Sequence, residues 1–265
     1  MTSLKSEFRL FLAEAVGTAL LLFFGLSFVI FNWGEGSIVA KTIPSEAARK
    51  LLTGFLFGTV GCLVTISPVG KISGAHINPA VSIAFWLRGK MKTGVMIGYI
   101  ISQMIGAILG CLPLLLWGKQ GSSIQFGITK PGETGIVDAF VGEVLVTSCL
   151  IFYLYMFIGS KKLRNYTPFG IPVLYSLLTW AEASYSGCST NPARSFGPAL
   201  VSRIFSGYWL YWIAPLVGVL ITTAIFRIRR LHHVYHMHAA RVSYHSSPTP
   251  DSLKSGFYDE QKKSD

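Results

Sequence analysis

Two short polar segments carry most of the residues that could do chemistry in this chain of 265 residues. They are SGAHINPAVS at 73–82 and SGCSTNPARS at 186–195, and both contain the triplet Asn-Pro-Ala. Asparagine is a favoured N-cap and proline is favoured at the first helical position, so each triplet predicts the start of a helix. The residues concerned are Asn78, Pro79, Ala80, Asn191, Pro192 and Ala193.

The two asparagines predict a pair of hydrogen-bond donors. A capping asparagine uses its side-chain oxygen on its own helix and keeps its NH₂ group free. Two such donors, at the positive ends of two helix dipoles, favour a small neutral molecule with a lone pair and repel cations. A water molecule bound through its oxygen in this way does not relay a proton. Backbone carbonyls in the extended segments before the triplets, at 71–77 and 184–190, would supply acceptors for a permeating molecule.

Arg194 breaks the likeness between the two segments, because valine stands at the matching place in the first one. An unpaired arginine in lipid is costly, so we expect Arg194 to face water and add a fixed positive charge near one mouth of a pore. The alternative is a loop arginine that snorkels outward. His76, two residues before Asn78, is expected either to line the cytoplasmic vestibule or to be a structural histidine.

A second pair of matching segments places a glutamate inside an apolar run. AEAVGTALL at 13–21 contains Glu14, and GEVLVTSCL at 142–150 contains Glu143. Intramembrane carboxylates are rare and usually functional, which would suit a proton-coupled carrier. The alternative is that each carboxylate accepts hydrogen bonds from backbone N–H groups of a loop, and the matched positions favour this structural role.

The composition indicates a membrane protein. Apolar residues make up 51% and charged residues 13%, whereas a soluble domain has about 25% charged residues. The net charge of +11 comes from Lys and Arg clustered between apolar runs, as in cytoplasmic loops, so no nucleic-acid partner is expected. Because the sequence shows no nucleophile triad, metal-ligand cluster or phosphate loop, it predicts no enzyme, no metal and no cofactor.

Six apolar stretches are predicted to cross the bilayer, at 9–31, 50–68, 94–117, 136–159, 168–184 and 208–228. Two shorter runs, at 77–87 and 190–205, begin at the repeated segments and are predicted to be re-entrant half-helices. Each half of the chain then contains three full spans, an odd number, so the second half is inserted upside down relative to the first. The predicted fold class is an all-α membrane protein with an inverted repeat, whose site lies at the midplane.

The expected organisation is a cytoplasmic N-terminus at 1–8, a channel domain at 9–230 and a disordered cytoplasmic tail at 231–265. The two repeats cover about 9–117 and about 136–228. Lys and Arg residues are more frequent on the side of the N-terminus, which places both termini in the cytoplasm. We expect a plasma or inner membrane protein.

Over about residues 5–230 the chain resembles the aquaporin or major intrinsic protein family. The resemblance rests on AEAVGT, SGAHINPAVS, GEVLVT and SGCSTNPARSFGPAL. It implies a right-handed bundle of six tilted helices and two half-helices, one pore per subunit, and a homotetramer in the lipid bilayer.

The resemblance also implies a selectivity filter made by Arg194 and three further positions. Counted back from the asparagines, these are Gly58, Thr179 and Cys188. Gly58 and Thr179 are small, so the resemblance implies a filter wider than a strict water filter and more polar than a glycerol filter. The alternative is that Phe57 or Trp180 fills the space, although each lies about 100° round its helix from the counted position.

Other family markers favour water, namely Ser195, Ala199 and the pair Tyr211-Trp212. The sequence therefore predicts a passive water channel that excludes protons and ions and also passes small neutral solutes such as ammonia or hydrogen peroxide. The alternatives are a broader facilitator for glycerol or urea, an ion-coupled carrier that uses Glu14 or Glu143, and a junction or adhesion protein with a vestigial pore.

Overall fold

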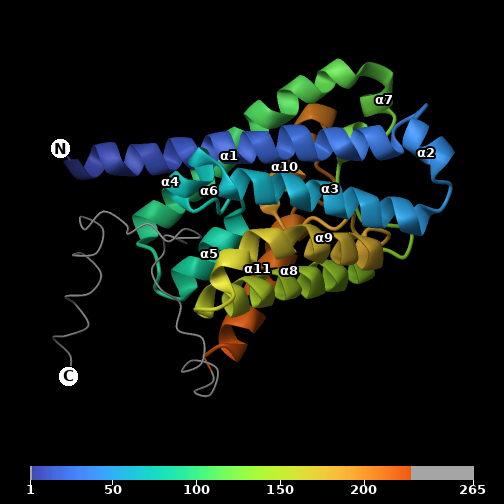
Figure 1. Cartoon of the computed structure of the whole chain (residues 1–265). Coiled ribbons are helices and arrows are strands. Elements are labelled where there is room, and N and C mark those ends of the chain that lie inside the picture. Colours follow the sequence, from blue (N-terminus) through green and yellow to red (C-terminus); the bar gives the residue numbers. More distant parts are fainter. Residues whose placement is uncertain (1, 228–265) are drawn as a thin grey trace.

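The computed structural model describes residues 2–227, and this part of the chain is helical without strands (Figure 1). The predicted tail at 231–265 lies outside the described residues. The long helices are α1 (Thr2–Trp33), α3 (Glu46–Ile66), α6 (Thr93–Cys111), α8 (Ile136–Gly159), α9 (Thr167–Glu182) and α11 (Leu210–Ile225). The half-helices are α5 (Pro79–Leu87) and α10 (Pro192–Ser202). Shorter elements are α2 (Ile38–Thr42), α4 (Pro68–Ser73), α7 (Gly118–Ser122) and the 3₁₀ turns η1 (Leu112–Trp117), η2 (Gln125–Gly127) and η3 (Arg164–Tyr166).

The six predicted long helices and both half-helices are present, which confirms the fold class. By length and apolar composition alone, four of the long helices can cross a membrane: α1, α3, α6 extended through η1 and α7, and α8. The other two, α9 and α11, have 16 residues each and contain an internal proline. Large apolar side chains such as Leu63, Leu109 and Leu145 remain more than half exposed, as expected for helices that face lipid.

The contacts between helices repeat in the two halves of the chain. In the first half α1 packs on α6, and in the second half α8 packs on α11. Each half-helix packs on the last helix of the opposite half, so α10 contacts α6 and α5 contacts α11. This exchange places both half-helices inside the bundle and joins the two repeats into one body (Figure 1).

The two repeats also meet where α3 packs along α9, and two glycines make that approach possible. A Cβ atom on Gly58 would lie 2.8 Å from Cα of Pro172 and 2.9 Å from the carbonyl oxygen of Ile171. Gly54, one turn earlier on α3, lies equally close to the backbone of α9 at Tyr175. Small residues four apart are a common means of close helix packing in membranes, because lipid supplies no hydrophobic drive for association.

We predict that Gly58→Ala destabilises the protein by about 1–3 kcal/mol, because the added methyl overlaps the α9 backbone, which has no flexible end to move. The thermal unfolding midpoint in detergent measures the effect. Gly94→Ala is the matched control, because a Cβ there meets nothing within 4 Å and alanine favours the helix. Equal midpoints for the two variants would contradict the proposed packing role of Gly58.

Candidate functional site

The two half-helices begin at the two asparagines. The side-chain oxygen of Asn78 accepts a hydrogen bond from the Ala80 amide at 2.8 Å. That of Asn191 accepts from the amides of Ala193 at 3.0 Å and Arg194 at 3.3 Å. Both asparagines have extended backbones, and a proline follows each at the first helical position. The helix starts are thus the ones that the triplets predict, and α5 and α10 point their positive ends at each other's loops.

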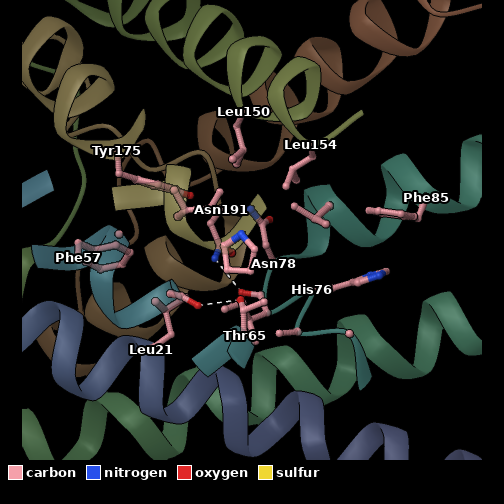
Figure 2. Close-up of a pocket in the computed structure, with 18 residues that line it drawn as sticks. Leu21, Phe57, Thr65, His76, Asn78, Phe85, Leu150, Leu154, Tyr175 and Asn191 are labelled. Atoms are coloured by element: carbon pink, nitrogen blue, oxygen red, sulfur yellow. Dashed lines mark hydrogen bonds between the residues drawn. The ribbon is translucent and has the colours of Figure 1, made fainter. Parts of the chain in front are cut away.

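The NH₂ group of each asparagine, however, is only partly free. Nδ2 of Asn78 donates to the carbonyl of Thr190, and Nδ2 of Asn191 donates to the carbonyl of Ile77, both at 2.9 Å. The sequence-based expectation of wholly free NH₂ groups is wrong, because one hydrogen of each joins the two repeats. The second hydrogen remains for a molecule in the cavity that both asparagines line (Figure 2).

The loops before the half-helices have an unusual backbone. Ala75 and Ile77 in one loop, and Cys188 and Thr190 in the other, have φ between 44° and 54°. Left-handed conformations of non-glycine residues cost about 1–3 kcal/mol each and persist only where other interactions hold them. In each loop a residue without positive φ lies between the two left-handed residues. Successive N–H and C=O groups along the loop therefore point in different directions.

Glu14 and Glu143 provide those interactions. The carboxylate of Glu14 accepts from the amides of His76 at 2.9 Å and Ile77 at 2.7 Å. The carboxylate of Glu143 accepts from the amides of Ser189 at 2.5 Å and Thr190 at 2.9 Å. Each receives one further side-chain donor, from Gln103 at 2.7 Å and from the Ser186 hydroxyl at 2.6 Å. Both carboxylates are fully buried and make the backbone contacts that a structural role requires.

Arg194 lies in the first turn of α10 and is buried, with 6% of its surface exposed. Its Nη1 atom donates to the Gly127 carbonyl at 2.7 Å, in the connection between the repeats. Its Cζ atom lies 5.8 Å from the centre of the Phe57 ring. The side chain is therefore held inside the protein and does not snorkel outward from a loop.

The three positions assigned to the filter by counting from the asparagines do not all lie together in the structure. Thr179 and Cys188 lie next to each other, close enough for the hydroxyl and the thiol to interact. Gly58 contributes backbone atoms to the cavity wall, but a side chain at this position would point at α9. Phe57 is the residue of α3 whose ring faces Arg194, and that ring packs where Gly25 of α1 has no side chain.

The expectation of an open space at Gly58 therefore needs correction, because α3 is rotated so that Gly58 faces α9 and the Phe57 ring faces Arg194. Trp180, the other aromatic considered, is 51% exposed on the far side of its helix.

His76 lies in the cavity wall, and its ring packs within the protein. The ring stacks on Phe85 with centroids 4.8 Å apart and places Nδ1 3.2 Å from the Ser82 hydroxyl. In Figure 2 the asparagines lie at the centre, with Phe57 and Tyr175 on one side and His76 and Phe85 on the other.

Two tyrosines position the loops, a role that the sequence did not reveal for either, although Tyr211 is one of the family markers and the repeat contains a signal for both. The Tyr99 hydroxyl donates to the Ser73 carbonyl at 2.8 Å, and the Tyr211 hydroxyl donates to the Ser186 carbonyl at 2.7 Å. Ser73 and Ser186 are the first residues of the two repeated segments. Each tyrosine lies on the last helix of its own repeat, so an alignment of the two halves would have paired them.

Glu182, at the end of α9, is a third buried acid. It is 4% exposed, and neither carboxylate oxygen has a hydrogen-bond partner of normal geometry. The carboxylate fits against α8 at Gly142, where any side chain would collide with it. Within residues 2–227, no group of three His, Cys, Asp or Glu side chains is arranged to hold a metal ion.

Six long helices in an inverted repeat, with two half-helices meeting at a polar centre, define a membrane channel protein. The sequence profile of the major intrinsic protein family matches residues 1–226, and the chain belongs to this family. Members of the family are integral membrane channels, which places this chain among transport proteins.

Individual relatives agree with this assignment. Aquaporin TIP2-1 of Arabidopsis thaliana is 31% identical over 216 residues, which cover 80% of this chain and 84% of that protein. Aquaporin-8 of Mus musculus is 31% identical over 227 residues, covering 82% and 80%. The X-ray structure of the aquaglyceroporin from Plasmodium falciparum has a TM-score of 0.67 at 21% identity and covers 86% of this chain and 98% of its own, which shows the shared fold.

We predict that mercurials block flux through this protein and that Cys188→Ser removes the block, because the thiol lies beside Thr179 at the proposed filter. Stopped-flow light scattering of proteoliposomes measures the flux. Cys149→Ser is the matched control, because Cys149 is an exposed thiol on α8 and its loss should leave the block intact. Inhibition that persists in Cys188→Ser would contradict the assignment of Cys188 to the filter.

Proposed function

We propose that this chain is a passive water channel that excludes protons and other ions. The observation that carries the proposal is the asparagine pair. Each NH₂ group has one hydrogen committed to the opposite loop and one left for the cavity, and each asparagine is 3% exposed. Two fixed donors bind a water molecule through its oxygen, so its hydrogens point along the channel, away from both donors.

The charges around the cavity support ion exclusion. Both half-helices direct their N-terminal ends, each worth about half a positive charge, toward the asparagines. Arg194 adds a full positive charge on the side of Phe57 and is anchored by the Gly127 carbonyl. Cations meet a repulsive potential at both places, and anions meet a narrow wall that is largely apolar and cannot replace their hydration.

The buried acids argue against the carrier alternative. A transported proton needs a carboxylate that can gain and lose it without loss of structure. Glu14 and Glu143 each accept three hydrogen bonds, and two of these hold the backbone of a loop. Protonation of either would weaken the loop that forms the site, so both carboxylates suit a permanent structural role.

The relatives named as aquaporins, at 31% identity, also support water as the permeant. Ammonia and hydrogen peroxide remain further candidate solutes, because each is small, neutral and has a lone pair. We place the protein in a plasma or inner membrane as a homotetramer with both termini in the cytoplasm. Native mass spectrometry of the detergent-solubilised protein tests the tetramer, and a protease applied to intact cells tests the orientation.

Proteoliposomes in stopped-flow light scattering test the proposed function. Under an impermeant osmolyte, vesicles with the protein are expected to shrink much faster than empty vesicles, without a proton gradient. The same vesicles under glycerol or urea should shrink and then reswell no faster than empty ones. Rapid reswelling would favour the broader facilitator, a need for a proton gradient would favour the carrier, and no flux from folded protein would contradict the channel.

We predict that Arg194→Asn raises proton permeability by roughly tenfold while water flux continues, because the variant loses the fixed positive charge beside the channel. A pH-sensitive dye inside proteoliposomes reports the proton leak. Arg203→Asn is the matched control, since Arg203 is an exposed arginine at the other end of α10 and asparagine tolerates its left-handed backbone. Equal proton leaks in the two variants would contradict the role given to Arg194.

A further inference from the structure

Thr179 by itself leaves the outer part of the channel wide. Its side chain is small, and so is that of Cys188 beside it. Gly58 does not change the width at this level, because a side chain there would point at α9 and away from the channel. A channel bounded only by these residues and Arg194 would have room for a solute with a carbon skeleton. The side chains that narrow the channel must therefore come from other positions, and the Phe57 ring beside Arg194 is one of them.

Tyr175 lies one helical turn before Thr179 on the same face of α9, since residues four apart on a helix are neighbours. It lines the cavity together with Phe57 and Asn191. Figure 2 shows Phe57 and Tyr175 on the same side of the asparagine pair. The two rings have centroids 6.0 Å apart and planes tilted by 36°.

Both aromatic rings are held in place. The Tyr175 hydroxyl lies 2.9 Å from the Thr190 hydroxyl, and the Thr190 carbonyl is the acceptor for Asn78. The Phe57 ring fits against Gly25 on one side and lies 5.8 Å from Arg194 on the other. A chain of contacts thus runs from the guanidinium through two rings to the residue that precedes Asn191.

Gly58 explains how the tyrosine reaches this position. A Cβ on Gly58 would lie 3.1 Å from Cβ of Tyr175, in addition to its overlap with Pro172. The glycine lets α9 move close to α3 at the level of the tyrosine, so the absent side chain brings an aromatic ring toward the channel. Its effect is the opposite of the widening that the sequence suggested.

We propose that Tyr175, paired with Phe57, forms the narrowest point of the channel, between the Arg194 filter and the asparagine pair, and that it excludes polyols and urea. The inference deepens the proposed function and rests on it, because it identifies what limits the permeant to the size of water. Water needs only a gap between the rings and the opposite wall. Glycerol and urea would have to displace the Tyr175 ring, which packs beside the Phe57 ring, or the Phe57 ring itself, which fits against Gly25.

Three variants test this constriction, each reconstituted in proteoliposomes and assayed for water and for glycerol. Tyr175→Val removes the ring and keeps an apolar side chain; we expect retained water flux and a glycerol permeability raised by about tenfold or more. Tyr175→Phe keeps the ring without its hydroxyl and should exclude glycerol as the original chain does. Trp180→Val removes an exposed aromatic from the far side of the same helix and should change neither flux.

The outcomes distinguish this inference from the proposed function. Absence of water flux from the folded original chain would contradict the proposed function. Water flux with glycerol already permeant in the original chain, or with glycerol still excluded in Tyr175→Val, would overturn the inference alone. A rise in Tyr175→Phe as large as in Tyr175→Val would also overturn it, because the hydroxyl rather than the ring would then set the limit. If Tyr175→Val fails to fold by size-exclusion chromatography, Tyr175→Leu takes its place with the same expectations.

Discussion

The structure depends on the need to satisfy backbone amides that leave the helical pattern in the middle of a membrane. An unpaired N–H group in hydrocarbon costs several kcal/mol, on the order of the whole stability of a small domain. The loops before α5 and α10 each present such groups, and a buried glutamate from the first helix of the same repeat accepts two of them. The burial of Glu14 and Glu143 is tolerated because every loop amide they accept would otherwise lack a partner.

This constraint also organises the rest of the site. Because the amides turn toward the glutamates, the left-handed residues direct neighbouring carbonyls elsewhere, and the carbonyls of Ile77 and Thr190 accept the amide groups of the opposite asparagines. The glutamates therefore shape the loops, while the two asparagines cap the half-helices through their oxygens and join the repeats through their NH₂ groups. A change in the charge of Glu143 would therefore disturb the asparagine pair as well as its own loop, because Thr190 contacts both Glu143 and Asn78.

The departure from two-fold symmetry is concentrated on one side of the asparagines. His76 and Phe85 lie on one side, whereas Phe57 and Tyr175 lie on the other, nearest to Arg194. A symmetric pore would present the same wall to both solutions. In the proposed function Arg194 acts on charge and the aromatic pair beside it acts on size, so ion exclusion and solute exclusion would come from neighbouring but different residues.

The amino-acid sequence by itself determined the helices, the inverted repeat and the asparagine pair, because each depends on local preferences: apolar length, capping and a repeated motif. It also favoured a structural role for Glu14 and Glu143, since their matched positions follow from the repeat. Only the tertiary structure showed which residues line the wall of the cavity. Whether Gly58, Phe57 or Tyr175 faces the cavity depends on how closely α3 and α9 approach and on how each helix is rotated, and both follow from contacts between residues more than 100 positions apart. A count along the chain carries no information on that rotation, so only the packed helices show which of these residues turn a side chain toward the cavity.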